Sequence, residues 1–393
     1  MLSILEHPNL DPVIFWVKKP ELALRWYGLM YVLAFTVGFA IFHWLQKTGY
    51  LRIAAKDVSN YIIVGVLGTF LGGRLGYVLF YQFDRLFLEE GIKFAERMKL
   101  IYAVWDGGMS FHGGVFGVTL AVFLYTKLRK HSFWNIMDGS THIVPLGVAL
   151  VRCGNFINAE LYGRTINDAS GQPIFDADKL PWYAMKFSTD HFPGAQDELH
   201  QALVRDYYAA HPGATEIPPE ALQSLPVKHE VWEQVAQFFP GRYPSQIVQF
   251  AFEGLLVLIA MWILRRHIKR PGVMAGLFLL AYAVFRIPAE MIRQPDAQID
   301  PTAAGELTGT AAFLHGIGMT MGQFLSVVII GMGLCVIVVR LWRGKPDADY
   351  TVAERRKGFF RDTLHDLPEL LGLRKPKPEA APADKPAPAP ETK

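Results

Sequence analysis

A series of long apolar runs, separated by charged connectors, constrains the fold of this chain more than any other feature. A run of about 18 or more apolar residues is the usual length of a membrane-spanning helix. We count seven candidate runs, at about residues 24–45, 58–82, 112–126, 136–157, 245–264, 272–291 and 321–340, of which the third is short. With 51% hydrophobic and 19% charged residues, the chain is also more apolar than a soluble protein of its length. The sequence therefore predicts an all-α polytopic membrane protein with seven transmembrane helices.

The connectors that follow the first, third, fifth and seventh runs carry Lys and Arg with little acid. Because positively charged loops stay on the cytoplasmic side of a membrane, this pattern predicts an N-terminus outside and a cytoplasmic C-terminus. The first 21 residues lack the basic start, apolar core and cleavage site of a signal peptide, so we expect no cleavage there.

Three regions differ in composition. We expect a seven-helix transmembrane domain over residues 1–340, with an extracytoplasmic insert at 158–242 that forms a small head lobe. A solvated loop is the alternative for that insert, although long loops without structure are uncommon in compact proteins. Residues 346–393 are rich in Pro, Ala and Lys, which predicts a disordered cytoplasmic tail. We find no internal repeat, and its absence weighs against a transporter fold.

Several charged side chains lie inside the predicted spans, where an arginine costs about 2.5–3.5 kcal/mol and usually faces a cavity or a partner. They are Arg74, Arg152, Glu253, Arg286 and Glu290. Arg286 and Glu290 are one helical turn apart and share a face with Tyr282. Extension of the guanidinium to the lipid phosphates is the alternative for Arg74. A purely structural ion pair is the alternative for Arg286.

Arg152 stands at the head of a polar stretch, because Gly154, Asn155, Asn158 and Glu160 follow it closely. Such a stretch cannot face lipid. A guanidinium makes two-pronged contacts with phosphate oxygens that lysine cannot match, and a phospholipid head group is the phosphate available at this depth. The arginines therefore predict a phosphate-binding site near the outer leaflet.

His112 lies in the glycine-rich stretch "WDGGMSFHGGVFGV" at the start of the third run. Its side chain titrates near neutral pH, and the flanking glycines allow a substrate or a neighbouring helix to approach closely. A helix cap or a buried hydrogen-bond partner is the alternative for this residue. Only two cysteines occur, Cys153 and Cys335, both inside predicted spans, and their spacing indicates neither a disulfide nor a metal site.

Five motifs together resemble, in order and spacing, those of the bacterial prolipoprotein diacylglyceryl transferases. They are "RWYGLMY" (25–31), "GGRLGYVLFY" (72–81), "WDGGMSFHGG" (105–114), "GNFINAELYG" (154–163) and "FRIPAEMIRQPDAQ" (285–298). The similarity runs from about residue 11 to 340, apart from the outer segment.

The resemblance implies a seven-helix enzyme of the bacterial inner membrane with its active site toward the periplasm. Such an enzyme moves the diacylglyceryl group of phosphatidylglycerol onto the lipobox cysteine of a preprolipoprotein, before the signal peptide is cleaved. The products are a thioether-linked lipid and glycerol phosphate. The expected partners are phosphatidylglycerol, the preprolipoprotein signal peptide and the lipid bilayer. We expect a monomer that uses no metal and no soluble cofactor and binds no nucleic acid.

The resemblance also assigns residues. The expected catalytic residues are His112, Arg152, Arg286, Tyr27 and Tyr282. The expected phosphatidylglycerol-binding residues are Arg152, Asn155, Asn158, Glu160, Gly163, Arg286, Glu290 and Arg74. His112 is either the base that accepts the thiol proton or a group that only positions the lipid.

The chain departs from the family pattern in the run "YPSQIVQ" (243–249), where Val248 and Gln249 replace a tyrosine and a glutamate. The outer segment is also longer than expected. A transporter that passes an anionic head group, or a receptor that uses the outer lobe, remains a rival interpretation of the same arginines.

Overall fold

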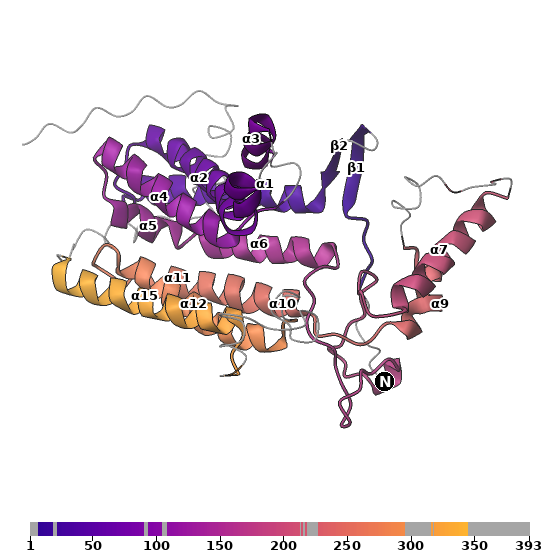
Figure 1. The fold of residues 1–393 in the computed structure, drawn as a ribbon. Helices are drawn as coiled ribbons and strands as arrows, with labels where there is room; N and C mark the ends of the chain where they lie inside the picture. The colour runs from indigo at the N-terminus through magenta and orange to yellow at the C-terminus, as the bar shows by residue number, and fades with distance from the viewer. Residues whose placement is uncertain are drawn as a thin grey trace, which may run out of the picture. The chain divides into compact units, whose positions relative to one another are not determined.

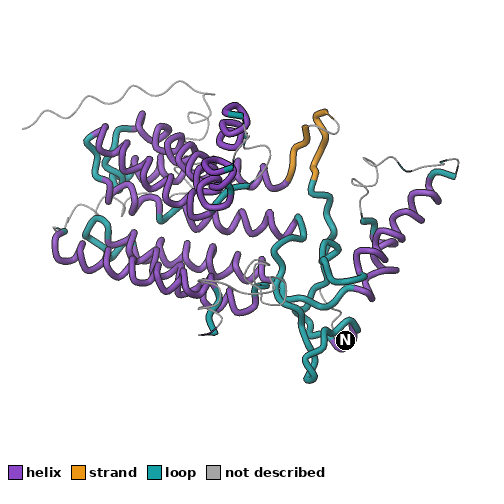
Figure 2. Tube along the Cα trace, in the orientation of Figure 1, coloured by secondary structure: helices purple, strands orange, loops and turns teal. Residues whose placement is uncertain are grey.

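The computed structural model describes residues 7–18, 22–89, 93–103, 108–212, 214, 217, 227–294, 316 and 318–344. All of these belong to one compact unit, Met1–Glu354. Helices dominate this unit and run side by side through much of it (Figures 1 and 2). The tail expected over 346–393 and the first three residues of the "WDGG" motif lie outside the described residues.

Five helices among the described residues are long and apolar enough to cross a membrane. They are α1 (Trp26–Lys47), α2 (Ala55–Tyr81), the continuous helix Ser245–Leu264, α12 (Val273–Ile292) and α15 (Met321–Arg343). Each covers one of the apolar runs in the sequence. A further helix, α4 (Phe111–Arg129), covers the third run. The helical membrane protein is thus confirmed in coarse form, while a count of seven spans stays a prediction.

The fourth run, expected as one helix over 136–157, is interrupted. It forms α5 (Phe133–Ser140) and α6 (Val144–Ile157), with a turn between them and Pro145 in the first turn of α6. Proline favours the start of a helix because it has no N–H to donate to a preceding turn. The Asp138 carboxylate, near the end of α5, accepts hydrogen bonds from the backbone N–H groups of Gly272 (2.7 Å) and Ala275 (2.9 Å). The expectation of one unbroken helix is therefore wrong. The carboxylate of α5 also holds the first turn of α12 in place through these two hydrogen bonds.

The expectation of an all-α chain also needs correction. Strands β1 (Val13–Lys18) and β2 (Leu22–Arg25) form an antiparallel pair directly before α1. A short helix, α3 (Phe94–Tyr102), lies between α2 and α4 in the chain. A span count overlooks both elements because each is much shorter than a membrane crossing.

Helices α2 and α4 approach each other through glycines. A Cβ atom on Gly76 would lie 2.6 Å from the Cα atom of Gly113, and one on Gly117 would lie 2.6 Å from the Cα atom of Gly72. Only glycine permits this separation, since small residues let helix backbones meet closely in membranes. The glycines around His112 therefore serve, at least in part, a helix–helix contact.

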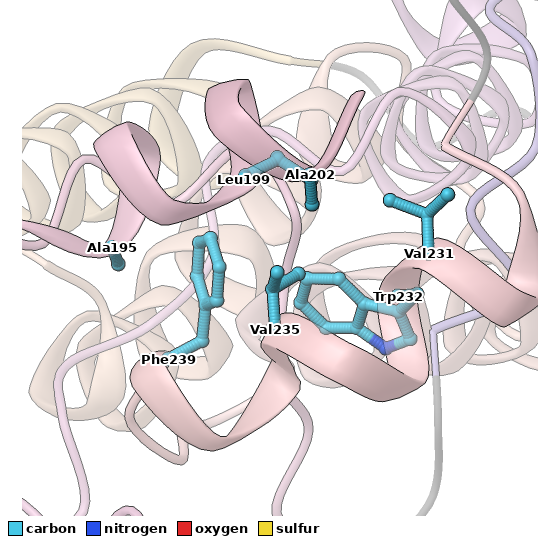
Figure 3. Close-up of a cluster of buried hydrophobic side chains, with 7 residues drawn as sticks. All are labelled: Ala195, Leu199, Ala202, Val231, Trp232, Val235 and Phe239. Atoms are coloured by element: carbon cyan, nitrogen blue, oxygen red, sulfur yellow. The ribbon is translucent and has the colours of Figure 1, made fainter. Parts of the chain in front are cut away.

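Residues 158–242 contain a hydrophobic cluster of their own, formed between α7 (Ala195–Ala210) and α9 (His229–Val235). Figure 3 shows its buried side chains, Ala195, Leu199, Ala202, Val231, Trp232, Val235 and Phe239. The two ends of this lobe run antiparallel to each other, with a bridge between Thr165 and Arg242 and a hydrogen bond from Ile166 N to Gly241 O (2.8 Å). The lobe thus leaves and rejoins the helical region at one place.

Candidate functional site

The candidate site lies where α6 and α12 pack against the helix Ser245–Leu264. This helix consists of α10 (Ser245–Gln249), the π-helix η5 (Phe250–Leu256) and α11 (Val257–Leu264). A Cβ atom on Gly254 would lie 2.6 Å from the Cβ atom of Ala149, so η5 and α6 are in backbone contact there. π-Helical turns inside α-helices occur frequently at functional sites, because the extra residue redirects a side chain.

Glu253 of η5 is fully buried and joins arginines from the two neighbouring helices. Its Oε1 and Oε2 atoms lie 3.0 and 3.1 Å from Nη1 of Arg286, and Oε2 lies 3.6 Å from Nη2 of Arg152. Nη2 of Arg286 lies 3.0 Å from Oε2 of Glu290. A buried charge is tolerated only when it is paired, and here two guanidiniums are matched by two carboxylates. We call this group the arginine network.

A chain of side-chain contacts extends the arginine network to the end of α6. Nη1 of Arg152 donates to Oδ1 of Asn155 (3.2 Å), and Nδ2 of Asn155 donates to Oε1 of Glu160 (2.8 Å). The backbone turns sharply here, since Ala159 and Leu161 have φ angles of 53° and 55°. Non-glycine residues in this left-handed region are strained, and such strain often accompanies a functional site. The turn carries the Glu160 carboxylate back toward Asn155.

Two tyrosines lie beside this group. A Cβ atom on Gly154 would lie 2.9 Å from Cδ2 of Tyr27, so the Tyr27 ring of α1 covers the α6 backbone at that point. Tyr282 of α12 lies close enough to Glu253, Arg286 and Arg152 to interact with them electrostatically. Both tyrosines thus belong to the surroundings of the arginine network.

Gly163 and Asn158 flank the same turn. The Gly163 N–H donates to the carbonyl oxygen of Tyr243 (2.8 Å), where a Cβ atom would lie 2.7 Å from that oxygen. Close backbone packing therefore explains the glycine. Asn158 is the C-cap residue of α6, and its Oδ1 atom is buried without a hydrogen-bond partner among the described residues.

His112 and Arg74 belong to the α2–α4 pair rather than to the three helices of the arginine network. The helix cap of α4 is Ser110, whose hydroxyl accepts a hydrogen bond from Gly113 N (3.2 Å), so the cap interpretation of His112 is wrong. The His112 side chain is exposed.

Arg74 is only 4% exposed and donates to the carbonyl oxygens of Leu100 (2.9 Å) and Gly108 (3.2 Å). These bonds tie the segment before His112 to α2, so the guanidinium does not extend toward lipid phosphates. Its expected contact with phosphatidylglycerol stays a prediction.

The sequence identified most of this group but assigned no role to Glu253. An acidic residue inside an apolar run was the available signal, yet nothing in its spacing links it to Arg152, which lies about one hundred residues earlier. Gln246 was also missed, and its Nε2 atom donates to the backbone oxygen of Glu160 (2.7 Å). Glu253 and Glu290 hold the two largely buried guanidiniums in place, and Nε of Arg152 has no hydrogen-bond partner among the described residues, so this group can still donate to a phosphate.

Comparison with known proteins gives a consistent result. Residues 12–339 match a family model described as prolipoprotein diacylglyceryl transferase. A phosphatidylglycerol–prolipoprotein diacylglyceryl transferase of Ralstonia pickettii (strain 12J) is 38% identical over 342 residues, covering 85% of this chain and 95% of the relative. Enzymes of the same name from Paraburkholderia xenovorans (strain LB400) and Salmonella paratyphi B are 36% and 35% identical; they cover 87% and 88% of this chain, and the matches span 98% and 97% of those relatives.

Proposed function

Since this chain belongs to the prolipoprotein diacylglyceryl transferase family, we propose that it transfers the diacylglyceryl group of phosphatidylglycerol to the lipobox cysteine of preprolipoproteins. This is the first step of lipoprotein maturation. The names of the relatives support the two substrates, and the helices long enough to cross a membrane support a reaction at a bilayer.

The arginine network is the observation that carries this proposal. Arg152 and Arg286 come from different helices and meet at one carboxylate, Glu253. This arrangement holds two guanidiniums together in a buried place, where their attraction for an anion is stronger than in water. A phosphodiester between a diacylglyceryl group and a glycerol head group is an anion of this kind.

The reaction forms a carbon–sulfur bond and breaks a carbon–oxygen bond. The cysteine sulfur attacks the glyceryl carbon that carries the phosphate, and glycerol phosphate leaves with the electron pair of the broken bond. The thiol must give up its proton, because the thiolate is the nucleophile and a free cysteine has a pKa of about 8.5. We assign the proton to His112, whose side chain is exposed at the start of α4.

Arg152 and Arg286 stabilise the charge on the leaving phosphate, and preorganised charges of this kind usually lower a barrier most. Glu253 and Glu290 hold the guanidiniums in place before the lipid arrives. Tyr27 and Tyr282 assist the two arginines in the reaction. The remaining assigned residues bind or orient the phosphatidylglycerol head group. They are Arg74, Asn155, Asn158, Glu160, Gly163 and Glu290.

The placement of the enzyme in the cell follows from the same proposal. The enzyme resides in the bacterial inner membrane as a monomer, with seven spans over residues 1–340, the N-terminus outside and the C-terminus in the cytoplasm. The lobe at 158–242 faces the periplasm, and the tail at 346–393 extends into the cytoplasm. The basic connectors after alternate spans support this orientation.

The test uses the purified full-length protein, phosphatidylglycerol and a lipobox peptide. Mass spectrometry should detect a thioether-linked diacylglyceryl peptide with the wild type, and the Arg152→Ala and Arg286→Ala proteins should lose at least 100-fold in rate. Lipid movement across vesicles without a covalent product would instead identify a transporter and would refute the proposal.

A further inference from the structure

Beyond the arginine network, the same helix carries a line of buried polar side chains toward its N-terminal end. Gln246, Gln249 and Glu253 are spaced three and four residues apart, which places them on one face of a helix. They are 0%, 1% and 0% exposed. The helix segment that carries the two glutamines packs against both α6 and α12, the helices that contribute Arg152 and Arg286.

Gln249 is the unusual member of this line. Neither its Oε1 nor its Nε2 atom has a hydrogen-bond partner among the described residues. Oε1 of Gln246 also lacks a hydrogen-bond partner among the described residues, while Nε2 of Gln246 donates to the backbone oxygen of Glu160. A buried amide without partners costs free energy, and proteins keep such groups only for a reason. A ligand that brings polar groups of its own to these atoms would remove that cost.

The position of Gln249 narrows the chemistry of that ligand. Gln249 ends α10 and Glu253 lies in the first turn of the π-helix η5, so Gln249 lies about one helical turn, or about 5 Å along the axis, from the carboxylate that joins the two arginines. A three-carbon head group attached to a phosphate bound at the arginines spans such a distance. A phosphate at the arginines and hydroxyl groups at the unpartnered amides would therefore be the two halves of one head group.

Charge and hydrogen bonding select among head groups. An amide offers both a donor and an acceptor, as a hydroxyl group requires, and carries no charge. An ammonium head group would only donate, so it would leave the amide N–H groups without an acceptor. We propose that Gln246 and Gln249 bind the hydroxyl groups of a neutral polyol head group and thereby make the enzyme select phosphatidylglycerol. This inference rests on the proposed transferase function and adds to it two specificity-determining residues.

The experiment compares phosphatidylglycerol with phosphatidylpropanol, a lipid of equal charge whose head group lacks hydroxyls. Both are supplied to the full-length enzyme with a lipobox peptide, and kcat/KM is measured for each. We expect the wild type to prefer phosphatidylglycerol at least tenfold, since a site built to bind a hydroxyl discriminates against a substrate that lacks it. Gln249→Met should lower kcat/KM for phosphatidylglycerol at least tenfold more than for phosphatidylpropanol. Gln237→Met, the same change on an exposed lobe residue, should leave the preference intact.

A second measurement needs no variant and so does not depend on folding. Glycerol phosphate should inhibit the wild-type enzyme at about one tenth of the concentration that propyl phosphate requires. Equal use of the two lipids, or equal inhibition by the two phosphates, would overturn the head-group proposal while leaving the transferase function standing. Failure of the wild type to modify the peptide with either lipid would instead refute the transferase function itself.

Discussion

Glu253 accepts two hydrogen bonds from one nitrogen of Arg286, with its Oε1 and Oε2 atoms at 3.0 and 3.1 Å from Nη1. The carboxylate comes from a π-helix and the guanidinium from α12, so their pairing joins two apolar helices through charge. Because Arg152 also lies 3.6 Å from the same carboxylate, Glu253 sets the distance between the two guanidiniums. The geometry of the site thus depends on a residue that need not touch the substrate.

Replacement of that carboxylate tests the point. Glu253→Gln keeps the shape of the side chain but leaves two buried cations with less compensation, which typically costs about 3–5 kcal/mol when a buried pair is broken. We expect a lower unfolding temperature in detergent and at least a tenfold lower transfer rate. Glu230→Gln, the same change at an exposed position on α9, serves as the control. Unchanged rate and stability in Glu253→Gln would show that the arginines do not need this partner.

The shape of the guanidinium matters as well as its charge. Lysine keeps the charge at position 286 but cannot contact Glu253 and Glu290 at once as Arg286 does. Arg286→Lys should therefore lower kcat about 100-fold. Arg205→Lys on the exposed face of α7 should have no effect. Wild-type kcat in Arg286→Lys would mean that charge alone suffices at this position.

The close contact between α2 and α4 predicts that alanine will destabilise the protein at Gly113 but not at Gly147. A Cβ atom on Gly113 would lie 2.8 Å from the Cα atom of Gly76, whereas one on Gly147 would meet nothing within 4 Å. Gly113→Ala should force the helices apart and destabilise the protein by about 1–3 kcal/mol. Gly147→Ala should be neutral or stabilising by up to about 1 kcal/mol, because alanine favours a helix. Thermal unfolding of both proteins in one detergent measures the difference, and similar unfolding temperatures would contradict it.

Asp138 should contribute to stability rather than to catalysis. It accepts two backbone hydrogen bonds at the start of α12, and charge-assisted bonds of this kind contribute about 1.5–3 kcal/mol each. Asp138→Ala should lower the unfolding temperature by several degrees, while the smaller change Asp138→Asn keeps one acceptor and should lose less. Asp178→Ala, on the exposed surface, is the control. Equal stability of the Ala and Asn proteins would argue against the capping role.

A histidine outside the spans predicts a pH dependence. His7 is buried against Phe156 and Phe187, and burial lowers its pKa below the usual 6.5, although a hydrogen bond with the Phe156 carbonyl opposes the shift. The unfolded chain then binds this proton more readily than the folded one. Stability from His7 is therefore complete above pH 6.5 and is lost as pH falls below that value toward the folded pKa.

Unfolding temperatures measured from pH 7.5 to 5.0 show whether stability falls with pH in this direction. The wild type should lose stability over the acid part of the range, and His7→Gln should lose less over the same interval. His200→Gln, at an exposed position, should follow the wild type. An identical pH profile for His7→Gln and the wild type would exclude His7 as a source of the acid sensitivity.

The sequence predicted the structure best where a run of residues of one type, apolar or polar, strongly favours one environment. Long apolar runs located the long helices, and the polar stretch after Arg152 indicated contacts that the structure contains, from Arg152 to Asn155 and on to Glu160. The interruption between α5 and α6 was harder to foresee, since residues 136–157 form one mostly apolar run despite Asp138 and Pro145, and the hydrogen bonds of Asp138 reach a helix far along the chain.

Pairings across helices could not be derived from one sequence. Glu253 meets Arg152 and Arg286 only because Gly254 brings η5 against Ala149, and no periodicity within a single helix encodes that approach. The glycines near His112 show the same limit. The sequence allowed either a substrate or a helix to approach them, and the structure places the backbone of α2 against Gly113 and Gly117.

The joined ends of the lobe bear on how this chain could have diverged. Thr165 and Arg242 are bridged, and Ile166 is hydrogen-bonded to Gly241. Residues added or removed between these two strands of backbone therefore change only the lobe that they enclose. The helices that carry the arginines need not move when the insert grows. Insertions or deletions in this lobe can therefore change its surface without altering the arginine network.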